Sequence, residues 1–157
     1  MLNATRPDDA VEQIERLLAE HRALQKQIDS MKVQIAQAQV GRLEHDAREI
    51  KGVKVLAGRV EGLDRGQLRA LTDSLRNKWK SAVVVLASTD NGNIAIVSAV
   101  TKDLTSKVHA GKLLSAVAQA IGGKGGGRPD MAEGGGKDAS GLPGALSEVY
   151  AKVEGML

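Results

Sequence analysis

Apolar residues recur every three or four positions through the first third of the chain, which predicts one long helix from Asp8 to about Ala47. Pro7 suits the first turn of this helix, and the aspartates after it favour the positive end of the helix dipole. The spacing alternates strictly between three and four, as in the heptad of a coiled-coil seam. One seam position holds Ile14, His21, Ile28 and Ile35, and the other holds Leu17, Leu24, Met31 and Ala38.

A helix with such a stripe cannot bury it alone and requires a partner. We expect a second copy of the chain to supply that partner. The predicted dimer contact consists of Ile14, Leu17, Leu24, Ile28, Met31 and Ile35. Val11 and Leu18 widen the stripe at its start, which leaves open a helical hairpin or packing on another part of a longer protein. His21 lies on the seam, where a histidine is far more often a tolerated polar residue than a metal ligand.

Beyond residue 50 the pattern changes to short strands alternating with helices. Asp64 followed by Gln67 three residues later predicts a capping box at a helix start. The pair Asn91-Gly92 predicts a tight hairpin between two strands. The predicted strands are Val53–Ala57, Ser81–Ser88 and Ile94–Val100, and the predicted helices are 64–80, Thr105–Ile121 and a last one after Pro143. Met131–Gly135 is a possible further strand.

These elements predict an α+β fold, in which helices pack on a small mixed sheet and a long coiled-coil-like helix comes first. We expect two parts: residues 1–50 as the heptad helix and residues 51–157 as a globular domain. The chain has no cysteine, which excludes disulfides and thiolate metal sites and fits a reducing cytoplasm. Residues 1–10 are polar and do not resemble a signal peptide, and the longest apolar run, Ala82–Ala87, is too short to span a membrane.

The stretch Gly122–Gly136, GGKGGGRPDMAEGGG, contains eight glycines among fifteen residues. Glycine permits close approach to the backbone, and exposed N–H groups can line a concave anion site beside lysine and arginine. A packing loop that passes close to a sheet is the alternative, and the two interpretations are compatible. Lys124 is not followed by Ser or Thr as a phosphate-binding P-loop requires, and a helix rather than a strand precedes the glycines, which excludes a dinucleotide fingerprint.

The chain offers no sequence signal for catalysis or for a metal site. Its basic residues suggest a polyanionic partner instead, because residues 51–157 carry 15 basic and 10 acidic side chains, a net charge of +5, whereas residues 1–50 carry 7 and 9, a net charge of −2. Trp79 and Tyr150 are the only aromatic residues, so base stacking is nearly excluded and folded RNA read by its shape fits better than single strands. The candidate nucleic-acid site consists of Lys107, Lys112, Lys124, Gly125, Gly126, Gly127, Arg128 and Lys137.

Four motifs, in order, resemble the C-terminal domain of alanyl-tRNA synthetase together with the long helical connector before it. They are KGVKVLAGRV, LRNKWKSAVVVLAS, VTKDLTSKVHAGKL and GGKGGGRPDMAEGGGKD, and they cover most of residues 51–138. A related domain ends the DHH-family phosphoesterases, where histidine follows the triple glycine. Here Arg128-Pro129 follows it, and the DHH metal motif is absent, which argues against a phosphoesterase.

The resemblance implies a non-catalytic module. The parent would be an alanine–tRNA ligase that uses ATP and magnesium, with zinc in a separate editing domain, and none of these cofactors is expected in this chain. The domain would bind the outer corner of tRNA, link aminoacylation with editing on one tRNA, and contribute to a homodimer. Two alternatives remain: a purely architectural dimerisation module, and a domain that binds DNA or another nucleic acid.

Overall fold

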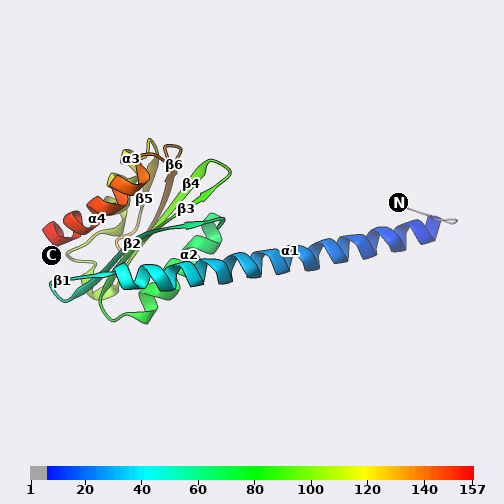
Figure 1. The fold of residues 1–157 in the computed structure, drawn as a ribbon, viewed down its shortest axis with the longest axis horizontal. Coiled ribbons are helices and arrows are strands. Elements are labelled where there is room, and N and C mark those ends of the chain that lie inside the picture. The colour runs from blue at the N-terminus through cyan, green and yellow to red at the C-terminus, as the bar shows by residue number, and fades with distance from the viewer. Residues whose placement is uncertain (1–6) are drawn as a thin grey trace.

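The computed structural model describes residues 7–157, so the first six residues of the predicted helical part lie outside the described residues. A long helix leads into a six-stranded sheet that carries helices on both faces (Figure 1). The elements in chain order are α1 Pro7–Leu43, η1 Glu44–Asp46, β1 Arg48–Ile50, β2 Val53–Glu61, α2 Arg65–Lys78, β3 Ala82–Asp90, β4 Asn93–Val100, η2 Lys102–Leu104, α3 Ala110–Ala120, β5 Lys124–Gly127, β6 Met131–Gly136 and α4 Leu142–Met156.

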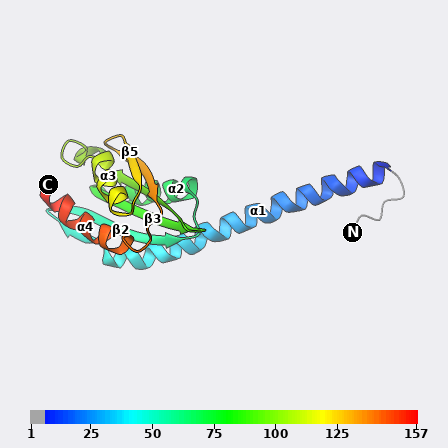
Figure 2. The same ribbon diagram turned by 90° about the horizontal axis from the view of Figure 1, so that it is seen from above.

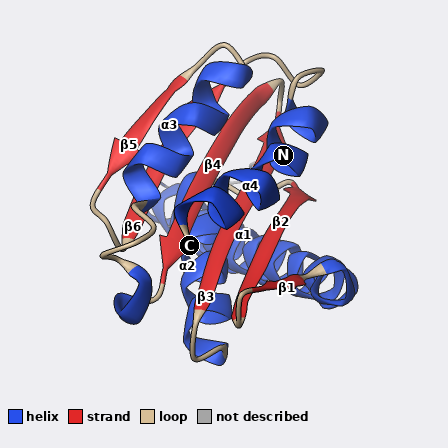
Figure 3. Ribbon diagram, turned by 90° about the vertical axis from the view of Figure 1, so that its left-hand side faces the viewer, coloured by secondary structure: helices blue, strands red, loops and turns tan. Residues whose placement is uncertain are grey.

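The strand order is β1-β2-β3-β4-β6-β5, with β2 and β3 parallel and the other neighbours antiparallel. Two apolar cores lie on opposite faces of this sheet. Helices α3 and α4 cover one face, and α2 with the end of α1 covers the other (Figure 3). The mixed sheet with packed helices after a long helix confirms the predicted α+β fold.

Several local predictions are confirmed. Asp64 accepts a hydrogen bond from the Gln67 N–H at 2.8 Å, and the Gln67 side chain accepts one from the Asp64 N–H at 3.1 Å, which is the complete capping box. β3 is buried over almost its whole length, as its apolar run predicts. The hairpin between β3 and β4 turns at Asn91-Gly92, both with positive φ. The possible strand near Met131–Gly135 is β6.

Other boundaries were predicted wrongly. Helix α1 ends at Leu43 instead of near Ala47, because the chain passes through η1 into β1. β1 itself was not predicted, since three residues give no periodic signal, and a two-residue turn with positive φ at Lys51 and Gly52 joins it to β2. Helix α3 begins at Ala110 instead of Thr105. The His109 imidazole caps the first turn of this helix by accepting a hydrogen bond from the Lys112 N–H at 3.4 Å.

The long helix belongs to the globular core at one end only. Ala36 and Val40 are buried against β2 and α2, and Leu43 lies over Gly58, so the last turns of α1 form part of the second core. The rest of α1 extends away from the sheet (Figure 2). No helix among residues 7–157 is long and apolar enough to cross a bilayer.

Candidate nucleic-acid interface

Most of the glycine stretch forms an antiparallel hairpin of β5 and β6 at the edge of the sheet. β5 was not predicted as a strand, because glycine has little intrinsic preference for strands and its placement here depends on tertiary packing. Three hydrogen bonds of 2.9 Å hold the turn of the hairpin, in which the N–H groups of Arg128, Val100 and Ala110 donate to the carbonyl oxygens of Met131, Asp130 and Pro129. The turn is therefore fixed by β4 and by the start of α3.

The glycines of this hairpin serve close packing more than anion binding. Gly125 and Gly134 pair across the two strands beneath Leu114 of α3, where a Cβ on Gly134 would lie 2.7 Å from the Gly125 Cα. A Cβ on Gly123 would overlap the carbonyl oxygen of Gly135. The carbonyl oxygen of Gly125 already accepts a hydrogen bond from Ser115 at 2.6 Å. Gly126 differs from these residues, since a Cβ there would meet nothing within 4 Å.

A groove runs between helix α2 and this hairpin, and we call it the arginine groove. Small residues, Gly66 and Ala70 of α2 with Gly126 and Gly127 of β5, leave room along it. Its charged side chains come from α2 and from the hairpin: Arg69, Asp73, Arg76, Arg128, Asp130 and Glu133.

The three arginines of the groove are paired with its three carboxylates. Arg69 donates to Glu133 at 2.9 Å, and Arg76 pairs with Asp73. Asp130 lies between two arginines, 3.5 Å from the Arg128 Nε and 3.9 Å from the Arg76 guanidinium. The Arg128 side chain remains 72% exposed and that of Arg69 52%, so both can reach a ligand. Guanidinium groups bind carboxylates and phosphates with the same fork geometry, so a phosphate would compete with these carboxylates for the arginines.

The predicted lysines divide between the two ends of the hairpin. Lys107 and Lys112 flank the start of α3, whose first N–H binds the hairpin turn, so they lie toward the Arg128 end. Lys124 and Lys137 lie at the opposite end of the hairpin. At 3.3 Å per strand residue, Lys124 is about 13 Å from Arg128 and Lys137 is about 20 Å from Met131. The Ser140 hydroxyl lowers the pKa of Asp138, so a carboxylate that follows Lys137 stays ionised and offsets part of its charge. All four lysines are exposed.

The candidate site predicted from the sequence included neither Arg69 nor Arg76. No spacing rule connects α2 with the hairpin, because the ion pair of Arg69 and Glu133 joins residues 64 positions apart. Neither aromatic residue is free for base stacking: Lys54 lies over the Trp79 ring, and Tyr150, with Arg48 over its ring, binds the backbone of Ala57. Among residues 7–157, no group of three or more potential ligands lies close enough to share a metal ion.

The fold and the glycine-rich hairpin define a DHHA1 domain: the family model with that description matches residues 52–155, and the chain belongs to this family. Its relatives narrow the assignment further. The chain is 66% identical over 147 residues to an alanine–tRNA ligase of Solibacter usitatus and 47% identical over 151 residues to that of Aromatoleum aromaticum. These matches cover 94% and 96% of the chain but only 17% of each relative, so the chain spans about a sixth of their length.

A solved structure agrees with the sequence relatives. The C-Ala domain of Aquifex aeolicus alanyl-tRNA synthetase superposes with a TM-score of 0.65 at 31% identity, covering 69% of this chain and 97% of that domain. The predicted resemblance to the C-terminal domain of alanyl-tRNA synthetase is therefore confirmed.

Proposed function

We propose that this chain is a non-catalytic module that binds tRNA in the cytoplasm and pairs two copies of its parent enzyme. The observation that carries the tRNA part is the arginine groove, where three guanidinium groups from α2 and the hairpin converge on one surface. The relatives are alanine–tRNA ligases, which supports tRNA as the polyanion. Within that enzyme, the module would hold the outer corner of the tRNA and so link aminoacylation with editing on one molecule.

The chain spans about a sixth of the length of the alanine–tRNA ligases that it matches, so we assign the cofactors of the parent enzyme to its other domains. ATP and magnesium for aminoacylation, and zinc for editing, would be bound by other domains of the parent ligase, and this chain would hold none of them. Contacts to the RNA backbone would come first from Arg128 and Arg69, because these side chains are exposed beside the small-residue floor of the groove. Lys107 and Lys112 would extend the contact at the turn, and Lys124 and Lys137 at the other end.

A titration of intact tRNA at two salt concentrations tests RNA binding. Each phosphate contact contributes a slope of about −0.7 to −0.9 in the logarithm of affinity against the logarithm of salt. We expect a total slope of about −1.4 to −3.6, as for two to four phosphate contacts at the groove and its neighbouring lysines. Filter binding or fluorescence anisotropy gives this slope. The absence of binding even at low salt would contradict the proposal.

A purely architectural role is the second candidate, and one observation favours it. The space beside most of the glycines that suggested an anion cradle is occupied by neighbouring protein atoms. Helix α1, in contrast, exposes a row of large apolar residues. On this account the chain would join two subunits and leave RNA binding to the rest of the parent. The salt titration distinguishes the two accounts, because an architectural module would show neither tRNA affinity nor a salt slope.

A further inference from the structure

Two cations lie beyond the end of the arginine groove that is farther from the hairpin turn. Within the groove, Arg69, Arg76 and Arg128 are each held by carboxylates. Arg65, at the start of α2, and Lys124, at the start of β5, are exposed and form no ion pair with any residue of the range 7–157. An anion can therefore bind to this pair without breaking an existing ion pair.

The register of the sheet brings these two cations onto one surface. Lys124 pairs with Gly135 across the hairpin, so both residues point to the same face, with Cβ positions about 4.5–5.5 Å apart. This is the face of Glu133, which binds Arg69 of α2. A guanidinium nitrogen of Arg65 lies 3.8 Å from the point where a Cβ on Gly135 would be. Because Gly135 has no side chain to stand between them, the ammonium of Lys124 and the guanidinium of Arg65 can reach one phosphate from two sides.

Helix α2 follows the hairpin along the whole length of β6. Three contacts succeed each other from one end of this strand to the other: Arg65 with Gly135, Arg69 with Glu133, and Arg76 with Asp130. From the first contact to the last, helix and strand each advance about 16 Å, at 1.5 Å per helix residue and 3.3 Å per strand residue. The groove is therefore a track with the unpaired cations at one end and Arg128 at the other.

The fold itself gives no reason for a cation at position 65. Arg65 is the first residue of α2, and a positive charge is unfavourable near the positive end of the helix dipole. The neighbouring Asp64 uses its carboxylate to cap the helix, where it accepts a hydrogen bond from the Gln67 N–H at 2.8 Å. Removal of the Arg65 side chain is therefore expected to leave the domain folded, so a change in RNA affinity would report a lost contact.

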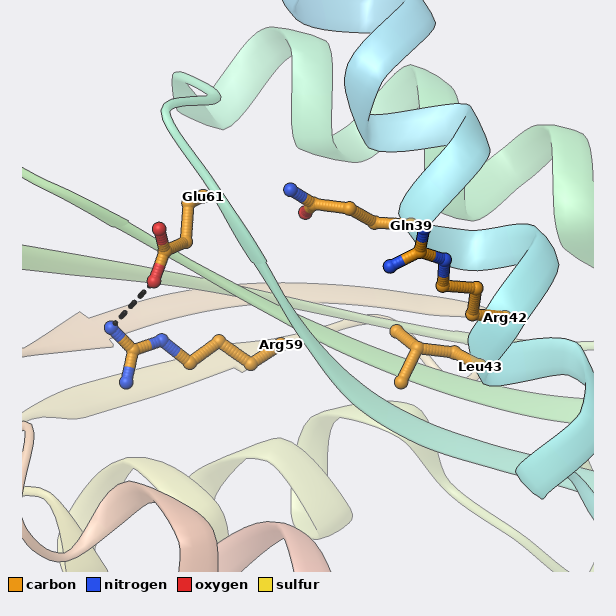
Figure 4. Close-up of a pocket in the computed structure, with 5 residues that line it drawn as sticks. All are labelled: Gln39, Arg42, Leu43, Arg59 and Glu61. Carbon is orange, nitrogen blue, oxygen red and sulfur yellow. Dashed lines mark hydrogen bonds and ion pairs between the residues drawn. The ribbon is translucent and has the colours of Figure 1, made fainter.

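Another unpaired arginine provides a comparison at the opposite edge of the sheet. A hollow between the end of α1 and β2 is lined by Gln39, Arg42, Leu43, Arg59 and Glu61 (Figure 4). Arg59 is bound to Glu61 at 3.2 Å, whereas Arg42 is exposed and forms no ion pair with any residue that the structure describes. Four strand spacings separate β2 from β5, which is about 19 Å at 4.7–4.9 Å per spacing. Arg42 therefore matches Arg65 in exposure and charge but lies away from the groove.

We propose that Arg65 and Lys124 together hold one phosphate of the bound RNA, and that the strand carrying it runs lengthwise along the arginine groove toward Arg128. This inference rests on the proposed binding of tRNA and adds a phosphate anchor, defined as Arg65 with Lys124, and the path of the strand. The bases remain outside the groove, because phosphate contacts fix the position of a nucleic acid without reading its sequence.

A double-variant cycle tests whether the two side chains of the anchor hold the same phosphate. Arg65→Ala and Lys124→Ala are each expected to weaken tRNA binding about fivefold or more, measured by fluorescence anisotropy at one salt concentration. The variant with both changes is expected to lose less than the product of the two single losses, because residues that share a partner are coupled. Arg65→Ala combined with Arg128→Ala is expected to give the full product, because these residues act at opposite ends of the groove. A full product for Arg65 and Lys124 would overturn the shared phosphate.

The control variant separates the anchor from a general effect of charge. Arg42→Ala is expected to bind tRNA almost as the native chain does, and equal losses for Arg42→Ala and Arg65→Ala would overturn the anchor. Native affinity of both Arg65→Ala and Lys124→Ala would also overturn it, whereas the proposed function would stand if Arg128→Ala still weakens binding. A native chain that binds no tRNA at low salt would overturn both proposals.

Inorganic phosphate distinguishes the RNA backbone from a free anion as the ligand of the anchor. At constant ionic strength, added phosphate is expected to leave the tRNA affinity of the native chain unchanged, because the anchor is one of several contacts to the RNA. A competitive loss of tRNA affinity that disappears in Arg65→Ala would assign the anchor to free phosphate and overturn the proposed path of the RNA strand.

Discussion

Alanine at Gly123 is expected to lower the free energy of unfolding by about 3 kcal/mol or more. The reason is a backbone collision: the new Cβ would overlap the carbonyl oxygen of Gly135, whose strand is held by β4 and β5 on either side. A rigid backbone oxygen cannot move aside as a flexible side chain could. Urea denaturation followed by circular dichroism measures the loss.

Gly126 provides the matched control three residues along the same segment. A Cβ there meets nothing within 4 Å, so Gly126→Ala is expected to change the stability by less than about 1 kcal/mol, with a gain if the unfolded chain loses entropy. Equal losses for the two variants would contradict the packing role that we assign to the glycines. Because Gly126→Ala keeps the fold, its tRNA affinity also reports whether the outward face of β5 lies near the RNA.

Alanine at Arg128 is expected to weaken tRNA binding by about 1–3 kcal/mol, which is about five- to 150-fold. The side chain is 72% exposed, and among residues 7–157 its one ion pair is with Asp130 at 3.5 Å. Its removal would therefore take away the proposed phosphate contact without disturbing the core. The magnitude of the salt slope is expected to fall at the same time by about the contribution of one phosphate contact. Titration of the variant against intact tRNA gives both quantities.

Two further variants make the Arg128 result specific to the groove. Arg16→Ala removes an arginine that is 82% exposed and ion-paired with Glu20 on α1, so it matches the change in charge away from the groove and is expected to bind tRNA almost as the native chain does. Glu133→Gln removes the carboxylate that holds Arg69 and is expected to strengthen binding. Unchanged affinity for Arg128→Ala, or equal losses of affinity for Arg128→Ala and Arg16→Ala, would contradict a tRNA contact at the groove. The hairpin would then have a structural role only.

The sequence predicted best where a local pattern decides the structure. The capping box of Asp64 and Gln67, the buried strand β3 and the Asn91-Gly92 hairpin each depend on a few neighbouring residues, and all three are present. β5 could not be predicted in this way. Four residues, three of them glycine, become a strand only because β6 and α3 approach them closely.

The candidate site shows more clearly that local sequence patterns do not predict contacts between distant segments of the chain. The glycine-rich motif that contains Arg128 led to the right family, but the predicted site followed the chain and stayed within residues 107–137. The structure instead brings Arg128 together with Arg69 and Arg76 of α2, and it pairs each of them with a carboxylate. The topology of the sheet determines this juxtaposition, and no periodicity within one segment encodes it. The glycines, predicted as either an anion cradle or close packing, mostly have the second role.

The most direct test of the central proposal compares the affinity of the full chain for intact tRNA with its affinity for a minihelix that has the acceptor stem but lacks the corner. Recognition of the outer corner predicts clearly tighter binding to intact tRNA at the same salt concentration, with the Arg128→Ala defect largely confined to that ligand. Equal affinity for the two RNAs would contradict corner recognition.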